Sequence, residues 1–297
     1  MIKTDINEMI RLAYDLHVHI GPEIIPRKYT ANSLGLDQGG KLTGCALKNH
    51  FYATSPMINS DCSNNLDMIG GIVLNNAVGG LNPEAVYAAS LVTKNPLIVW
   101  LPTINAEHFL KNNKFEIAPE WVTDKSLKMK SAKETKPAIV TKNGKLLDKT
   151  KLVINMVKQI NGILATGHIS PLESSMIAKY ARSLDIPVII THPIYQHINM
   201  PISQQKKLAA LGCYIEHTYS MYSLDGISIK KIVKQIKAVG VKSVIVTSDV
   251  GQIFSPSPSD ALADFSMKLI ENGLSISDLS TMLVTNPRLL IKKQLPS

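Results

Sequence analysis

Eight short apolar runs, separated by segments with helical start and stop signals, constrain the fold of this 297-residue chain more than any other feature. Most of these runs are continuously apolar, as expected for parallel strands that are buried on both faces. The predicted strands span residues 13–19, 43–50, 69–77, 96–103, 162–168, 186–192, 212–218 and 242–249. Because strand and helix alternate, and because eight parallel strands can close a ring, we expect an α/β fold of the (β/α)8 TIM-barrel type. An open, doubly wound sheet is the alternative.

Several of the intervening segments carry helix signals. Ser170-Pro171-Leu172-Glu173 combines an N-cap serine, a proline at the first helical position and a capping-box glutamate, which predicts a helix to residue 183. Asn82-Pro83-Glu84 opens a second helix in the same way. Two others, QQKKLAALG and IKKIVKQIKAVG, end at a glycine, the residue best suited to a left-handed C-cap.

The stretch 107–151 interrupts this rhythm, because it is too long for an ordinary loop between strand and helix. Within it, the Asn143-Gly144 dipeptide predicts a β-hairpin. We therefore expect a single barrel over residues 1–297, with a hairpin-containing insertion at 107–151 after the fourth strand. A lid over the barrel mouth is one interpretation of the insertion. A surface excursion or an oligomer contact is the other.

The formal net charge of +9 is concentrated in one part of the chain. Between Asp124 and Lys158 there are ten lysines and three acidic residues. Almost no aromatic residues interleave with these lysines, so the patch does not favour a nucleic-acid partner. We expect a solvated face, or a collar that attracts an anionic small-molecule substrate. A homo-oligomer remains open.

Composition also limits the cellular setting. No apolar run approaches the ~18 residues that a membrane span needs, so we expect no membrane partner. The N-terminal segment MIKTDINEMIRL contains acidic residues and lacks the apolar core of a signal peptide, which predicts a cytoplasmic protein. Cys45, Cys62 and Cys213 are widely spaced and form no CxxC motif. Neither a disulfide framework nor a cysteine-built zinc site is expected.

Histidines and one aspartate gather at the predicted strand ends. His17 and His19 are two residues apart on the first strand, so their side chains leave the same face. In a parallel barrel, the carboxyl ends of all the strands meet at one mouth. The other polar residues at strand ends are Lys48, His50, His168, His192 and Asp249. Four histidines and an aspartate from four different strands predict a metal site formed by His17, His19, His168, His192 and Asp249.

Imidazole and carboxylate donors suit zinc, with manganese, iron and nickel as alternatives, because affinity alone does not select the metal. Such an ion lowers the pKa of bound water toward neutrality and polarises a carbonyl or phosphoryl oxygen. An aspartate at this place, Asp249, can take the proton of the water and pass it to the leaving group. We expect one or two divalent ions.

This arrangement resembles that of the amidohydrolase superfamily of metal-dependent hydrolases, which carry HxH on strand one, histidines on strands five and six, and aspartate on strand eight. The C-terminal segment TNPRLL, residues 285–290, also resembles the NPA-type helix that closes many of those barrels. The resemblance covers nearly the whole chain in the order of its elements. It implies that His17, His19 and Asp249 hold one metal, and that His168 and His192 hold a second metal or contact the substrate. It also implies cleavage of an amide, lactone or related C–N or C–O bond.

The sequence departs from that pattern at strand four. Binuclear amidohydrolases usually bridge their metals with a carboxylated lysine or a glutamate from this strand, which here ends Leu101-Pro102-Thr103. Lys48 or Glu216 could supply a substitute for the bridge, or the site is mononuclear. If Lys48 does not replace the bridge, we expect Lys48 and His50 to be catalytic residues that contact the charged part of the substrate.

A second departure keeps another family open. Lys48-Asn49-His50 is similar to the TDH end of strand two in PHP-type phosphoesterases, and His50 would then be a ligand. That family commonly ends in DxH, whereas this chain reads Asp249-Val250-Gly251. A PHP-like phosphoesterase is therefore an alternative to the amidohydrolase-like hydrolase. A lyase or decarboxylase, and a barrel that binds metal without turnover, are further alternatives.

Three other histidines are weaker candidates. His108 lies in the insertion, and His197 lies in the loop after the sixth strand. His217 has the opposite strand parity to Glu216, so only one of these two side chains is expected to face the barrel interior.

Overall fold

The computed structural model describes residues 2–58, 65–93, 96–122, 124 and 126–292. Nine short parallel strands form two sheets, in the orders β1-β2-β3 and β11-β10-β9-β8-β5-β4. Their bounds are β1 Tyr14–His19, β2 Gly44–Lys48, β3 Asp67–Ile69, β4 Gly71–Val73, β5 Ile98–Trp100, β8 Ile163–Ala165, β9 Val188–Ile190, β10 Tyr214–Thr218 and β11 Val244–Thr247. Every predicted strand contains at least one of these nine.

Two junctions join the sheets into a ring. On one side, only Gly70 separates β3 from β4, and β3 pairs with β2 while β4 pairs with β5. On the other side, β1 meets the end of β11 through backbone hydrogen bonds from His19 N to Val250 O (2.8 Å) and from Asp249 N to His17 O (2.9 Å). Counting β3 and β4 as one interrupted strand, the ring has eight members. The (β/α)8 barrel is therefore confirmed, and the open sheet is excluded.

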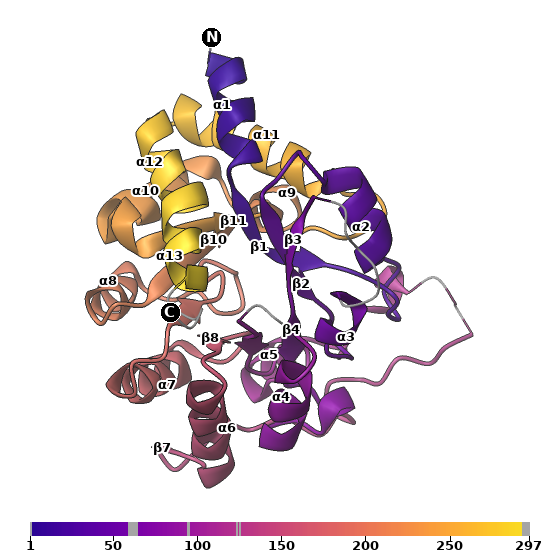
Figure 1. The fold of residues 1–297 in the computed structure, drawn as a ribbon. Coiled ribbons are helices and arrows are strands. Elements are labelled where there is room, and N and C mark those ends of the chain that lie inside the picture. Colours follow the sequence, from indigo (N-terminus) through magenta and orange to yellow (C-terminus); the bar gives the residue numbers. More distant parts are fainter. Residues whose placement is uncertain (1, 59–64, 94–95, 123, 125, 293–297) are drawn as a thin grey trace.

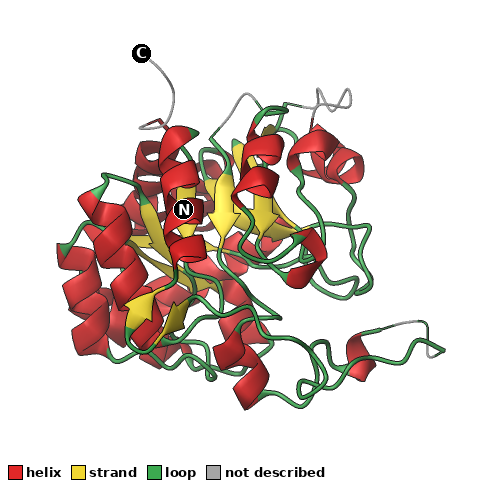
Figure 2. Ribbon diagram, turned by 90° about the horizontal axis from the view of Figure 1, so that it is seen from below, coloured by secondary structure: helices red, strands yellow, loops and turns green. Residues whose placement is uncertain are grey.

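Helices surround the strands (Figures 1 and 2). The α-helices are α1 Ile2–Arg11, α2 Ala31–Gln38, α3 Ser55–Ile58, α4 Pro83–Ser90, α5 Glu107–Asn112, α6 Asp148–Gln159, α7 Pro171–Ser183, α8 Ile202–Ala210, α9 Tyr219–Ser223, α10 Ile229–Val239, α11 Pro258–Glu271, α12 Ile276–Ser280 and α13 Asn286–Lys292. The other helical turns are η1 Asn76–Val78, η2 Pro119–Trp121, η3 Val241–Ser243 and η4 Thr281–Thr285. In the described parts of the chain, no helix has both the length and the apolar character needed to cross a membrane.

The predicted capping signals operate in the structure. Ser170 forms a reciprocal capping box with Glu173 at the start of α7, and Pro171 occupies the first turn. The side chain of Asn82 accepts hydrogen bonds from backbone N–H groups at the start of α4. Gly240 ends α10 with a φ of 94°, which only glycine adopts without strain. Local chemistry thus sets these helix boundaries.

The lower part of the barrel interior is an apolar plug. Leu16, Trp100 and Ile245 are among the buried side chains that fill it. Leu290 and Ile291 of α13 belong to the same cluster, so this helix closes the barrel from the end opposite the mouth. Asn286, at the start of α13, donates from its side-chain amide to backbone oxygens at 241 and 244, which fixes the helix against β11. Polar side chains are thereby left to the upper layer of the barrel.

The segment predicted as an insertion contains α5, η2 and an antiparallel hairpin, β6 Thr141–Lys142 and β7 Lys145–Leu146. Asn143 and Gly144 form the turn with φ values of 51° and 70°, as a type I′ hairpin requires. The hairpin is therefore confirmed. Helix α6 begins at Asp148, three residues inside the predicted end of the insertion. In Figure 1 the chain between η2 and β6 extends away from the barrel on the right.

Two of the three cysteines, Cys45 and Cys213, are buried free thiols. Cys62 lies outside the described residues.

Candidate metal centre

A β-bulge in β1 aims the first histidine at the barrel interior. The pairing of β1 with β2 shifts register between Asp15 and Val18. Leu16 packs in the apolar plug, and the ring of His17, the next residue, lies 5.8 Å from Trp100 above that plug. Two consecutive side chains therefore contribute to the interior, which an undistorted strand does not allow.

Asp15 supports this bulge from the other face of the strand. Its Oδ1 accepts hydrogen bonds from the backbone N–H groups of His17 (3.2 Å) and Ser248 (3.0 Å). The side chain is fully buried, and burial raises its pKa to about 7. Asp15 thus connects the irregular part of β1 to the end of β11, where the last predicted ligand follows.

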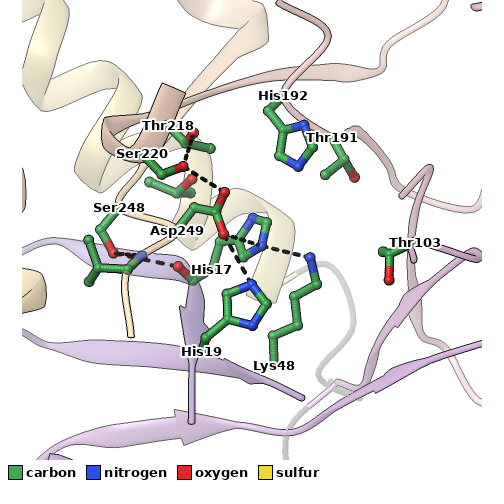
Figure 3. Close-up of polar contacts among 12 residues, drawn as sticks. His17, His19, Lys48, Thr103, Thr191, His192, Thr218, Ser220, Ser248 and Asp249 are labelled. Atoms are coloured by element: carbon green, nitrogen blue, oxygen red, sulfur yellow. Dashed lines mark hydrogen bonds and ion pairs between the residues drawn. The ribbon is translucent and has the colours of Figure 1, made fainter. Parts of the chain in front are cut away.

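The centre of the site is the group His17, His19 and Asp249 (Figure 3). Asp249 Oδ1 lies 3.0 Å from His17 Nε2 and 3.1 Å from His19 Nε2, and one ligand atom from each residue lies within 4.8 Å of the others. The second oxygen, Oδ2, accepts a hydrogen bond of 2.7 Å from the Ser220 hydroxyl. Asp249 has a φ of 53°, an unfavourable backbone conformation for a residue other than glycine, and such strain is concentrated at functional sites.

Glu216 lies behind His17. Its Oε1 accepts from His17 Nδ1 (3.0 Å) and from the Thr247 hydroxyl (2.9 Å), while Oε2 accepts from the backbone N–H of His192 (3.2 Å). Burial by itself would raise the pKa of Glu216, but the neighbouring His17 brings it below its usual value. Because both oxygens are engaged behind His17, Glu216 orients that imidazole so that its Nε2 points toward Asp249.

Lys48 lies on the opposite side of His17. Its Nζ is 2.8 Å from His17 Nε2 and 5.5 Å from the centre of the Trp100 ring. The side chain is 1% exposed, and burial lowers its pKa. Of the two substitutes that the sequence offers for the missing bridge, Lys48 is thus the one at the coordinating edge of His17.

Thr103 follows the fourth barrel strand, β5, where the resemblance to amidohydrolases would place the bridge. Its hydroxyl lies 3.0 Å from His50 Nδ1 and accepts from Asn75 Nδ2 at 2.8 Å. The ring of His50 is 4.7 Å from that of His19. A neutral hydroxyl that is already engaged in two hydrogen bonds cannot replace an anionic bridge.

His168 and His192 complete the upper layer of the barrel. Their ring centres are 5.1 Å apart, and His192 is 5.9 Å from His17. Burial lowers the pKa of both, that of His192 to about 4, so both rings are neutral. Their buried Nδ1 atoms have no hydrogen-bond partner among the described residues. The structure therefore brings all seven predicted site residues to one mouth.

A cavity of about 630 Å³ opens above this layer. His19, Lys48, His50, His168, His192 and Asp249 lie on its wall. The opposite wall comes from the segment 109–121, including Phe109, Phe115 and Trp121. Such a volume suits a small molecule, and the mixture of apolar wall and convergent polar groups is typical of binding sites.

The weaker histidine candidates lie apart from this group. His108 Nε2 is 2.7 Å from the backbone oxygen of His197, which ties α5 to the loop after β9. His217 is fully buried, and neither of its ring nitrogens has a partner among the described residues. Since Glu216 faces the barrel interior, His217 takes the other face of β10, as parity predicts.

Sequence reasoning missed several residues of the site. Arg27, whose side chain is only 2% exposed, pairs with Glu23, and its Nη2 lies 3.2 Å from His19 Nδ1. Ser220, which holds Asp249, and Tyr195, on the cavity wall, were also missed. Arg27 and Tyr195 lie in loops after β1 and β9, Ser220 lies in the short helix α9 after β10, and none of them carries a motif. Asp15 was missed as well. It is the one missed residue with a sequence signal, because it lies on the first strand two residues before His17.

The donor set fits a divalent cation. Burial by itself would lower the pKa of His17, but the charges of Asp249 and Glu216 raise it to about 9. The two carboxylates therefore stabilise a positive charge at the position of His17, whether this charge is a proton or a bound cation. Beside it, the neutral His168 and His192 have unpaired Nδ1 atoms, and imidazole and carboxylate are the ligands that zinc and similar ions use.

Replacement of Glu216 by Gln should weaken metal binding without unfolding the barrel. The amide keeps the shape of the side chain but loses the charge that orients and polarises His17. We expect a ~10- to 100-fold lower zinc affinity, measured by competition with a chromophoric chelator. The matched control is Glu116→Gln. This change neutralises a carboxylate that, unlike Glu216, lies on the cavity wall, and it should leave the zinc affinity unchanged. Equal affinities in both variants would contradict the orienting role.

His217 should make the protein less stable in mild acid. Burial lowers its pKa from 6.5 to about 4, so between these values the unfolded chain binds a proton that the folded chain does not. Stability therefore falls as the pH falls through this window. In His217→Leu, the loss of unfolding free energy from pH 7 to pH 5 should be smaller by about 2 kcal/mol, measured by urea denaturation. The same loss in both proteins would show that His217 does not titrate in this way.

Comparisons with known proteins agree with the geometry. Among solved structures, the chain is similar to an amidohydrolase from Pseudomonas aeruginosa, with a TM-score of 0.62, 10% identity and 99% of each chain covered. A probable dipeptidase from the same organism has a TM-score of 0.59 and 10% identity, over 99% of this chain and 98% of that one. A probable 2-pyrone-4,6-dicarboxylic acid hydrolase from Acinetobacter baumannii has a TM-score of 0.55 and 11% identity, over 94% of this chain and 98% of that one. At these identities the similarity establishes the fold.

A search of curated proteins finds no match. Residues 12–216, more than half of the chain, match the model of a family of unknown function, DUF6282. The protein therefore belongs to the DUF6282 family and has the barrel fold found in amidohydrolases.

Proposed function

We propose that this protein is a metal-dependent hydrolase that cleaves an amide, lactone or related C–N or C–O bond of a small anionic substrate. The observation that carries the proposal is the approach of His17, His19 and Asp249 ligand atoms to within 4.8 Å of one another beneath a cavity. Zinc suits this donor set best, with manganese, iron or nickel as alternatives. His168 and His192 are proposed to hold a second ion or to contact the substrate.

The residues of the chain divide the work. A bound divalent ion supplies acidification of water and polarisation of the substrate carbonyl. Asp249 takes a proton from the attacking water and later gives it to the leaving group, while Ser220 holds its other oxygen in place. His17 and His19, together with Asp249, would hold such an ion. Glu216 fixes the orientation of His17 from behind.

The proposal of an anionic substrate rests on three basic residues of a cavity wall that also carries Glu116, Glu120 and Asp225. Lys48 and Arg27, both with buried side chains, lie on that wall, as does the exposed Lys114 from the covering segment 109–121. We propose that Lys48 and His50 contact the charged or polarised part of the substrate. We also propose that the covering segment acts as the lid of the site, since Phe109, at the end of the segment nearest the barrel, packs against His168 at 5.2 Å between ring centres.

One observation favours a second candidate, a PHP-like phosphoesterase. His50 lies close enough to His19 for three histidines from the first two strands to gather, at 4.7 Å between the His19 and His50 rings. The hydrogen bond between His50 Nδ1 and Thr103 leaves the other ring nitrogen available. A substrate panel that includes both carbonyl compounds and phosphoesters separates the two functions.

Metal content is the first test. Protein purified without chelator should contain one or two divalent ions per chain by elemental analysis, and a His17→Ala/His19→Ala variant should lose them. Two ions would mean that Lys48 or another group replaces the bridge, whereas one ion would indicate a mononuclear centre. A matched His108→Ala variant should keep the wild-type content. No ion in the wild type, even after reloading with zinc or manganese, would refute the proposal.

Asp249→Asn should abolish turnover while the barrel stays folded. The amide cannot accept the proton of water, so we expect kcat on a hydrolysed panel compound to fall by about 10³-fold or more. Circular dichroism and thermal melting check the fold. Asp225→Asn is the matched control, because this aspartate lies on the same cavity wall and has no contact with the imidazoles in the described parts of the chain. A folded Asp249→Asn enzyme with undiminished activity would remove the mechanism.

A further inference from the structure

Tyr195 is a polar residue of the cavity that the mechanism above does not use. It lies on the cavity wall, with its ring 5.5 Å from that of His192 and 5.7 Å from that of His168. Its hydroxyl has no hydrogen-bond partner among the residues that the structure describes, although the ring is largely enclosed. The residue is half-buried, and a hydroxyl on the wall of a binding cavity that makes no hydrogen bond within the protein is available to a ligand.

The loop after β9 holds Tyr195 in a fixed place. Its backbone N–H donates to the oxygen of His192 (2.9 Å), which forms a tight turn directly after a predicted ligand. Its own carbonyl accepts from the N–H groups of Ile198 (2.9 Å) and Asn199 (2.7 Å). The ring also packs edge-on against His197, whose backbone oxygen contacts α5 through His108. The hydroxyl is therefore positioned before any ligand arrives, as an efficient transition-state donor must be.

The electrostatic surroundings keep this hydroxyl protonated. Burial raises the pKa of Tyr195 well above its usual value, and the nearby charges of Asp225 and Asp249 raise it further. Tyr195 and Asp249 both line this cavity. Tyr195 thus remains a hydrogen-bond donor at any pH at which Asp249 acts as a base.

We propose that the Tyr195 hydroxyl donates a hydrogen bond to the carbonyl oxygen of the substrate as that oxygen gains negative charge. This inference rests on the proposed function and narrows it to carbonyl compounds, namely amides, esters or lactones.

Tyr195 keeps its proton throughout the reaction. Asp249 takes one proton from water, the water oxygen bonds to the carbonyl carbon, and the π electrons of the carbonyl move to its oxygen, which Tyr195 stabilises. When that electron pair returns, the C–N or C–O bond breaks, and the leaving group takes the proton from Asp249.

The test is the Tyr195→Phe variant, which keeps the ring contacts and removes only the hydroxyl. Tyr222→Phe, the same change on a tyrosine of α9 outside the cavity lining, is the matched control. On any carbonyl compound that the wild type hydrolyses, Tyr195→Phe should lower kcat by about 10²- to 10³-fold. KM, zinc content and melting temperature should stay near wild-type values, since the bond forms mainly in the transition state. A kcat within about threefold of wild type would overturn the inference.

A binding measurement separates this inference from the proposed function. Methylphosphonate, a tetrahedral oxyanion, is titrated into zinc-loaded wild type and both variants by calorimetry. If the wild type hydrolyses no carbonyl compound, the proposed function fails, but an affinity about tenfold lower in Tyr195→Phe alone would still support an oxyanion donor. Equal affinities in all three proteins would overturn the donor role. No binding and no carbonyl turnover by the wild type would overturn both proposals.

Discussion

The hydrogen bonds between β1 and the end of β11 are the contacts on which both the barrel and the site depend. They close the ring of strands, and the same backbone groups belong to His17, His19 and Asp249. Asp249 is about 230 positions away from His17 and His19 in sequence, so no local interaction could bring it to them. A different pairing of these strands would separate the residues of the candidate metal centre even though every side chain stayed the same.

The apolar plug below the site explains why a polar layer can exist inside the barrel. Trp100 and its neighbours fill the interior, and α13 covers the far end, so the imidazoles lie between an apolar layer and the cavity. In such surroundings each buried charge needs a partner. Glu216 is such a partner, because its carboxylate contacts His17, while Asp15 holds the backbone at His17 and Ser248. The positions of the candidate ligands therefore depend on residues that are not themselves candidate ligands.

Much of this was predictable from the sequence. Continuous apolar runs identified all eight members of the ring, because strands buried on both faces leave no room for polar alternation, but the run at 69–77 included only the last residue of β3. Ser170 and Asn82 marked helix starts by local hydrogen bonding. The position of His17, His19, His168, His192 and Asp249 at strand ends placed them at one mouth as soon as a closed parallel ring was assumed. The site assignments themselves remain predictions.

The sequence by itself determined the elements, their order and the end of the barrel that carries the polar residues, since these follow from hydrophobic periodicity and short-range capping. Only the tertiary structure decided on which side of a strand or of the site a residue from a distant part of the chain would lie. The bulge that turns both Leu16 and His17 inward, the engagement of Glu216 behind His17, and the return of residues 109–121 over the cavity all depend on contacts between segments far apart in the chain. Such contacts are set by packing and closure of the whole ring, which no window of sequence contains.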